Sequence, residues 1–90
     1  MRKKVIIGNW KMNNDMKETK DLLINLSKTT WKKEIEVKVS PSYVNLQNAT
    51  KILKNSPIEV VAQNMHYEKE GAYTGEISYK MLKSINVNSV

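Results

Sequence analysis

Cysteine is absent from the 90 residues, which excludes disulfides, thiolate nucleophiles and cysteine-based metal sites. Histidine occurs once, as His66, so no second imidazole is present to complete a zinc site with it. No apolar run approaches the roughly 18 to 20 residues that span a bilayer, and the apolar stretch at residues 5–8 is too short for a signal peptide. We therefore expect a cytoplasmic protein with no metal site and no membrane contact.

Arginine is also scarce, because fourteen of the fifteen basic residues are lysines and Arg2 is the single arginine. The excess of basic over acidic residues gives a net charge of +6, which makes a nucleic-acid partner the first hypothesis to consider. The lysines are scattered along the chain with acidic residues between them, and no stripe of arginine and aromatic residues stands out. We predict no specific nucleic-acid partner and keep a non-catalytic basic binding module as the alternative function.

Short apolar runs alternate along the chain with segments of helical periodicity. β-branched residues gather in runs that are typical of strands, at residues 5–8, 35–39, 58–62 and, as the start of a fourth strand, 87–90. The first run is continuously apolar, and we expect it to be buried on both faces. Apolar residues recur at helical spacing in the segments between, at residues 15–29, 46–53 and 78–85, the last with Ser78 as its N-cap.

This alternation in units of about 30 residues is typical of an α/β protein with a parallel sheet and right-handed crossovers. The pattern agrees equally well with a closed barrel and with an open doubly wound sheet. No glycine-rich phosphate loop or dinucleotide-binding fingerprint follows the first strand, which argues against a nucleotide cofactor. No low-complexity linker divides the chain, so we expect residues 1–90 to belong to a single domain.

Four motifs occur at the ends of the predicted strands and in the loops after them. They are GNWKMN at residues 8–13, PSYV at 41–44, VAQNM at 61–65 and GAYTGEIS at 71–78. Together they resemble the triosephosphate isomerase family over the whole chain, with mild departures such as Tyr73 where a phenylalanine is common. That family forms a (β/α)8 barrel of about 250 residues. The resemblance implies a partial TIM barrel of about three βα units and the start of a fourth strand, with residues 1–90 as the N-terminal part, about the first third, of one incomplete barrel domain.

The resemblance also implies a site at the carboxyl ends of the strands, where such barrels carry their working residues. Lys11 is the implied catalytic residue, because its ammonium group binds the phosphate of a triose phosphate and stabilises charge on an enediolate. Asn9 is implied to bind and orient the substrate. Without the motif, Lys11 would be better interpreted as a solvated surface lysine. Asn9 would be better interpreted as a turn-forming residue after a strand. Gln63 and Asn64 are implied to support the active site and a dimer contact.

A dimer interface is implied by the same resemblance. In the family, the loop after the third strand projects into the neighbouring subunit, which assigns Thr74, Gly75 and Glu76 to the interface. Met12 and Asn13 are assigned to it as well. A solvated loop is the alternative for an isolated chain. We therefore expect a triose phosphate as the substrate and a homodimer for the full-length protein.

The implied reaction interconverts dihydroxyacetone phosphate and D-glyceraldehyde 3-phosphate by proton transfer through an enediolate, without metal or cofactor, in glycolysis and gluconeogenesis. The family's catalytic glutamate and electrophilic histidine belong to segments beyond residue 90. His66 lies in the loop after the third strand, and we interpret it as a solvated, non-catalytic side chain. We expect this chain to be inactive alone. Three hypotheses remain: a fragment of an ordinary isomerase, the basic binding module, and a short gene product whose missing barrel portion comes from another chain.

Overall fold

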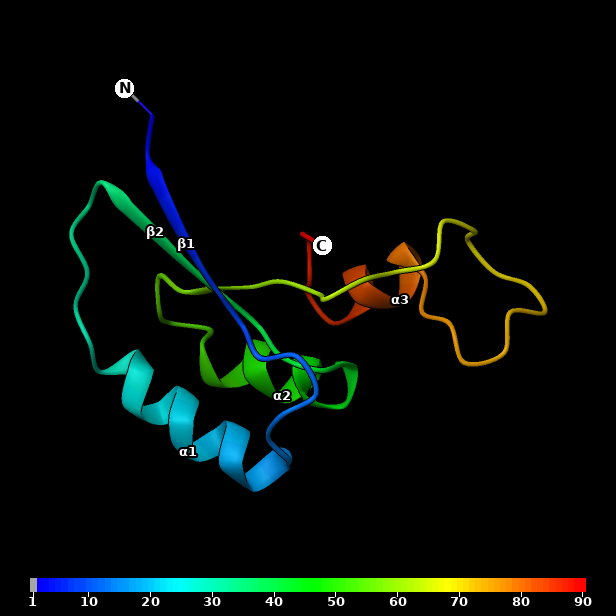
Figure 1. Ribbon diagram of the computed structural model, residues 1–90, viewed down its shortest axis with the longest axis horizontal. Coiled ribbons are helices and arrows are strands. Elements are labelled where there is room, and N and C mark those ends of the chain that lie inside the picture. Colours follow the sequence, from blue (N-terminus) through cyan, green and yellow to red (C-terminus); the bar gives the residue numbers. More distant parts are fainter. Residues whose placement is uncertain (1) are drawn as a thin grey trace.

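The computed structural model describes residues 2–90, which form a parallel sheet with helices packed against it (Figure 1). The elements follow one another as β1 (Lys4–Asn9), α1 (Met16–Ser27), β2 (Ile35–Ser40), α2 (Tyr43–Ile52), β3 (Glu59–Val60) and α3 (Tyr79–Ser84). The strands lie in the order β1-β2-β3, and both pairings are parallel. The alternating order and the parallel sheet predicted from the sequence are thus confirmed.

The ladder between β1 and β2 extends over six residue pairs, so the two strands end at the same level. β3 is shorter than the predicted strand at residues 58–62, because only two of its residues pair with β2. The backbone N–H of Val61 still donates to the carbonyl of Val39 at 2.8 Å, whereas that of Ala62 donates to the carbonyl of Ser89 at 2.9 Å. Residues 87–90 therefore lie beside β3, in the place expected for a fourth strand, although this contact does not extend into a regular strand.

Two of the helices begin at capping residues that the sequence supplies. The carboxylate of Asp15 accepts a hydrogen bond from the backbone N–H of Glu18 at 2.9 Å, and the carboxylate of Glu18 accepts one from the N–H of Asp15 at 3.1 Å. This capping box satisfies N–H groups that the start of α1 leaves without helical partners. Ser78 caps α3 as predicted, because its hydroxyl accepts from the N–H of Met81 at 3.3 Å.

Within residues 2–90, none of the helices has the length and apolar character needed to cross a membrane.

The core lies between one face of the sheet and the helices. Its buried apolar members are Leu23, Val39, Leu46, Ala49, Leu53, Ile58, Val60, Ala62, Leu82 and Val87. α2 is the central helix of this core, because it packs against both α1 and β3. Leu23 is the completely buried leucine through which α1 joins the core, as its helical periodicity predicted.

The prediction that β1 is buried on both faces is wrong. Val5, Ile6 and Ile7 are each about half exposed, at 50%, 53% and 53% of their surface. Among residues 2–90, β1 is an edge strand with β2 as its one strand neighbour, and α1 packs against α2 rather than against β1. Figure 1 shows the amino-terminal ends of β1 and β2 extending away from the helices. Burial of Val5, Ile6 and Ile7 would require further elements that cover the two faces of β1.

Candidate active site

Polar side chains gather at the edge of the sheet where the strands end. Asn9 is the last residue of β1 and lies opposite Ser40, the last residue of β2. Gln63 follows β3 and joins these ends, since its Nε2 donates to the carbonyl of Ser40 at 2.9 Å and to the carbonyl of Lys11 at 2.8 Å. Parallel strands share one carboxyl edge, and that edge is where α/β proteins bind ligands. Three segments distant in sequence therefore meet at a position suited to a ligand.

Lys11 is held in a left-handed backbone conformation at this edge, with a φ of 54°. Such a conformation is unfavourable by about 1–2 kcal/mol for a residue with a side chain. Two hydrogen bonds fix it: the N–H of Lys11 donates to Oδ1 of Asn9 at 2.9 Å, and its carbonyl accepts from Gln63. The side chain of Lys11 is exposed. The strain is thus stored in the backbone of a cation that is available to a ligand, which is an arrangement characteristic of functional sites.

The rest of the segment after β1 is tied to the same edge. The N–H of Trp10 donates to the carbonyl of Ser40 at 3.1 Å, and the side chain of Trp10 packs against the core. Nδ2 of Asn13 donates back to the carbonyl of Trp10 at 2.8 Å. Met12, at the tip of this turn, is 95% exposed. A large apolar side chain so fully in solvent is compatible with the predicted interface role of Met12 and Asn13.

Asn64 lies against the first turn of α2. The hydroxyl of Tyr43 contacts the backbone carbonyl and the side-chain oxygen of Asn64 as a hydrogen-bond donor. Burial, with the negative charge of Glu76 as the second cause, raises the pKa of the Tyr43 hydroxyl above its ordinary value. Tyr43 therefore stays protonated through neutral pH and connects α2 to the loop that contains Glu76.

That loop, residues 64–78, extends away from the rest of the molecule (Figure 1). Its base is closed by the N–H of His66, which donates to the carbonyl of Ile77 at 2.7 Å. Gly71 has a φ of 147°, and a Cβ there would lie 2.6 Å from the ring of Tyr73. Thr74, Gly75 and Glu76 are exposed at its far side. The loop is thus shaped by its own contacts and presents the predicted interface residues to solvent.

The interpretation of His66 as a solvated side chain is wrong. Its imidazole is half-buried and packs against two tyrosine rings, with centroids 4.6 Å from Tyr67 and 4.3 Å from Tyr73. Its Nε2 is buried and has no hydrogen-bond partner among the residues that the structure describes. The rings of Tyr67 and Tyr73 shield part of the imidazole from water. No periodicity connects His66 with Tyr73, so this contact was not predictable from the sequence. His66 therefore has a packing role in the loop.

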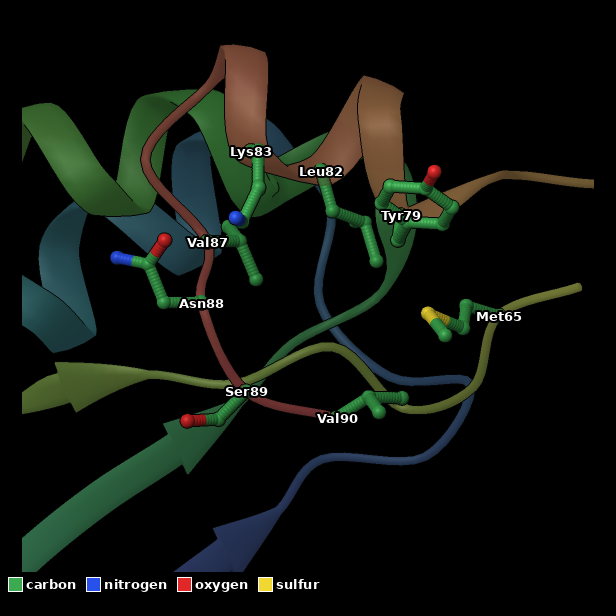
Figure 2. Close-up of a pocket in the computed structure, with 8 residues that line it drawn as sticks. All are labelled: Met65, Tyr79, Leu82, Lys83, Val87, Asn88, Ser89 and Val90. Carbon is green, nitrogen blue, oxygen red and sulfur yellow. The ribbon is translucent and has the colours of Figure 1, made fainter. Parts of the chain in front are cut away.

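A separate apolar cavity of about 160 Å³ lies between α3 and the C-terminal segment (Figure 2). Its lining consists of Met65, Tyr79, Leu82, Lys83, Val87, Asn88, Ser89 and Val90. Figure 2 shows the side chains of Leu82 and Met65 pointing into it. Neither Asn9 nor Lys11 contributes to this cavity, and a mainly apolar lining is unsuited to a small phosphorylated ligand. The carboxyl edge of the sheet remains the candidate site.

Sequence reasoning missed one residue that belongs to the surroundings of the site. Asn45, in the first turn of α2, is completely buried and donates a hydrogen bond to the backbone carbonyl of Asn14 at 3.0 Å. No periodicity or motif spacing links residues so far apart. One signal was available in the sequence: Asn45 is a polar residue in the first turn of the helix that follows Pro41 and Ser42. If this position is buried, its amide needs hydrogen-bond partners.

Parallel strands that alternate with helices, and a strained cation held by amide side chains at their carboxyl ends, define one of the α/β folds that bind ligands at the carboxyl edge of a parallel sheet. The comparison with protein families specifies which one. The model of the triosephosphate isomerase family matches residues 4–90, and the chain belongs to that family. The family and the fold class predicted from the sequence are both confirmed.

Individual relatives agree with the family match. The triosephosphate isomerase of Flavobacterium johnsoniae is 50% identical to this chain over 91 residues, and that of Flavobacterium psychrophilum is 46% identical over 91 residues. The triosephosphate isomerase of Clostridium botulinum (strain Loch Maree / Type A3) is 47% identical over 90 residues. Each comparison covers 100% of this chain but only 36% of the relative. The chain thus spans about a third of the length of the relatives it matches.

Proposed function

We propose that the protein is a triosephosphate isomerase or its N-terminal part, and that the complete barrel interconverts dihydroxyacetone phosphate and D-glyceraldehyde 3-phosphate through an enediolate. One observation supports this above the others: Lys11, an exposed cation with strained backbone geometry, is held by Asn9 and Gln63 at the carboxyl ends of parallel strands. Lys11 belongs to the segment GNWKMN at residues 8–13, and the family of the chain is known.

Lys11 has the catalytic role in this proposal. Its ammonium group binds the phosphate of the triose phosphate and stabilises the negative charge that develops on the enediolate oxygen. Asn9 binds the substrate beside it. Because Oδ1 of Asn9 accepts from the N–H of Lys11, Nδ2 is the group of that amide that donates to a substrate oxygen. Gln63 and Asn64 support this arrangement from the segment after β3, and the reaction uses no cofactor.

We further propose that residues 1–90 form the N-terminal part of one barrel domain in a cytoplasmic enzyme. The half-exposed β1 supports this, because it has an open edge for the strands that close a barrel. The complete protein forms a homodimer through Met12, Asn13 and residues 74–76. The exposure of these residues to solvent supports this assignment.

The 90 residues alone are expected to be inactive. In this family the proton is moved by a glutamate and a histidine that follow residue 90, and each positioned acid or base contributes about 10² to 10⁴-fold to a rate. The measurement is isomerase activity in a coupled assay, on the repurified 90-residue chain beside a buffer control. Turnover that persists through repeated purification and disappears in the Lys11→Gln variant would contradict the expected inactivity.

Substrate binding is tested without activity. Inorganic phosphate is titrated into ¹⁵N-labelled protein, and the expected result is a saturable shift of the backbone amides of residues 9–13. The variant Lys11→Gln is expected to lose this response, whereas Lys28→Gln, which removes an exposed lysine after α1, is expected to keep it. An equal response in both variants would show that Lys11 is not the phosphate ligand.

A further inference from the structure

Asn45 is a polar residue in an unusual place, since its side chain is completely buried in the first turn of α2. Asparagine is a poor helix former, and burial of an amide is unfavourable unless its hydrogen-bonding groups find partners. Its Nδ2 group finds two: it donates to the hydroxyl of Ser42 at 3.0 Å and to the backbone carbonyl of Asn14 at 3.0 Å. The second bond joins α2 to a residue 31 positions earlier in the chain.

Asn14 ends the segment that contains Lys11. It has a φ of 74°, so residues 10–15 include two left-handed residues other than glycine. Such a backbone needs fixed contacts at both ends to persist. Asn9 and Gln63 provide these contacts at the Lys11 end, and Asn45 provides one at the Asn14 end.

The orientation of the Asn45 amide is set by the loop. A carbonyl group only accepts hydrogen bonds, so the NH₂ group of Asn45 must face Asn14, and turning the amide over would bring two carbonyl oxygens together. In this orientation Oδ1 is buried without a hydrogen-bond partner among residues 2–90. An unpaired buried oxygen destabilises the fold. Helix stability alone therefore gives no reason for an amide here, whereas the contact with the loop does.

We propose that Asn45 is a positioning residue for Lys11: by holding the carbonyl of Asn14, it keeps residues 10–15 in the conformation that presents the lysine at the carboxyl ends of the strands. This inference rests on the proposed role of Lys11 in phosphate binding. Lys11 contacts the phosphate, whereas Asn45 acts through the backbone of the loop and contacts no substrate.

Backbone dynamics of the 90-residue chain test this role. Asn45→Ala removes both hydrogen bonds, and the control Asn48→Ala truncates a half-buried asparagine one turn further along the same helix. In Asn45→Ala, the ¹⁵N order parameters of residues 11–14 are expected to fall from about 0.85, typical of rigid backbone, to below about 0.6. Those of β2 and α1 are expected to stay unchanged, as are all values in Asn48→Ala. A wild-type segment that is already flexible, or an unchanged segment in Asn45→Ala, would overturn the proposal.

Ser42→Ala covers the case in which Asn45→Ala does not fold. This variant removes one of the two acceptors and leaves the Asn45 side chain in place, so a smaller fall in the order parameters of residues 11–14 is expected. Values equal to those of the wild type in Ser42→Ala would then overturn the proposal. A loss of order spread evenly over the sheet and helices would do so too, because it indicates a general structural role.

Phosphate affinity connects the positioning role to the site. With inorganic phosphate as the probe, Asn45→Ala is expected to bind about threefold to tenfold more weakly than the wild type, a loss of up to about 1.4 kcal/mol. Asn48→Ala is expected to bind as the wild type does. Equal affinity in Asn45→Ala and the wild type would overturn the positioning role. If the wild type shows no response at residues 9–13, the proposed function of the site fails, and the order parameters still decide the role of Asn45.

Discussion

Lys38 and Glu59 form a short ion pair between neighbouring residues of β2 and β3. Nζ of Lys38 lies 2.8 Å from Oε1 of Glu59, and the hydroxyl of Ser89 donates to Oε2 of Glu59 at 2.8 Å. These hydrogen bonds, that from Lys38 first, lower the pKa of Glu59 below its ordinary value. The hydrogen bond to Glu59 likewise raises the pKa of Lys38. One carboxylate thus connects β2, β3 and the C-terminal segment.

The direction of these shifts predicts how stability depends on pH. A carboxylate whose pKa falls on folding stabilises the protein above its ordinary pKa, about 4.3, and this stabilisation is lost as the pH falls through the lowered value. A lysine whose pKa rises on folding stabilises below about pH 10.4, and this is lost as the pH rises through the raised value. The contribution of the pair is therefore complete between roughly pH 5 and pH 10.

Glu59→Gln is expected to lower the free energy of unfolding at pH 7 by less than about 1 kcal/mol, because solvent screens the partly exposed pair. It is also expected to reduce the fall in stability between neutral and acidic pH. The measurement is urea unfolding across that pH range. Glu34→Gln, an exposed carboxylate just before β2, is the control and should leave the acid limb unchanged. Parallel pH profiles for Glu59→Gln and the wild type would contradict the assignment.

At the scale of the elements, α1 depends on its first turn. Asp15→Ala removes the side-chain half of the capping box with Glu18 and is expected to destabilise the protein by about 1 kcal/mol. Asp21→Ala removes an exposed carboxylate from the middle of the same helix and is expected to change stability by less than about 0.5 kcal/mol. Urea unfolding at pH 7 compares the two. Equal losses would indicate that the general charge of α1, and not the cap, determines its stability.

The helices and the alternation of strands with helices were predictable because local signals determine them. Leu23 at helical spacing and Ser78 before an apolar run correctly indicated a buried helix face and a helix start. The end of β3 was not predictable, since its apolar sequence continues while Ala62 takes a backbone partner at Ser89. At the candidate site, the prediction of Lys11 rests on the motif at residues 8–13. Asn45 escaped notice because its partner lies 31 residues away, and a sequence pattern contains no information on such a contact.

At the scale of the whole molecule, we expect the open edge of β1 to cause association between copies. Val5, Ile6 and Ile7 present half-exposed apolar surface on a strand whose outer edge has no strand neighbour within the part of the chain that the structure describes. Edge strands of this kind pair with other chains, and charged residues on the edge prevent it. The 90-residue chain is therefore expected to associate as its concentration rises from the micromolar to the millimolar range.

Val5→Lys is expected to reduce this association at little cost in stability, because position 5 lies opposite Glu36 and gains a cross-strand partner of opposite charge. Val44→Lys is the matched control, since Val44 is an 86% exposed valine that lies on α2 and not on β1. Sedimentation velocity over a concentration series measures the mean mass of both variants. A similar decrease in both would assign the association to surface charge in general and not to β1.

The two hydrogen bonds of Gln63 have a consequence for the order of folding. They span 52 and 23 residues of sequence, so neither forms until the segment after β3 has docked beside β2. The entropy lost in closing loops of this length delays such contacts relative to local ones. In an intermediate that has only its first two strands in place, the carbonyl of Lys11 lacks its hydrogen bond from Gln63. We therefore expect the turn around Lys11 to become ordered last, after the local contacts of the helices have formed.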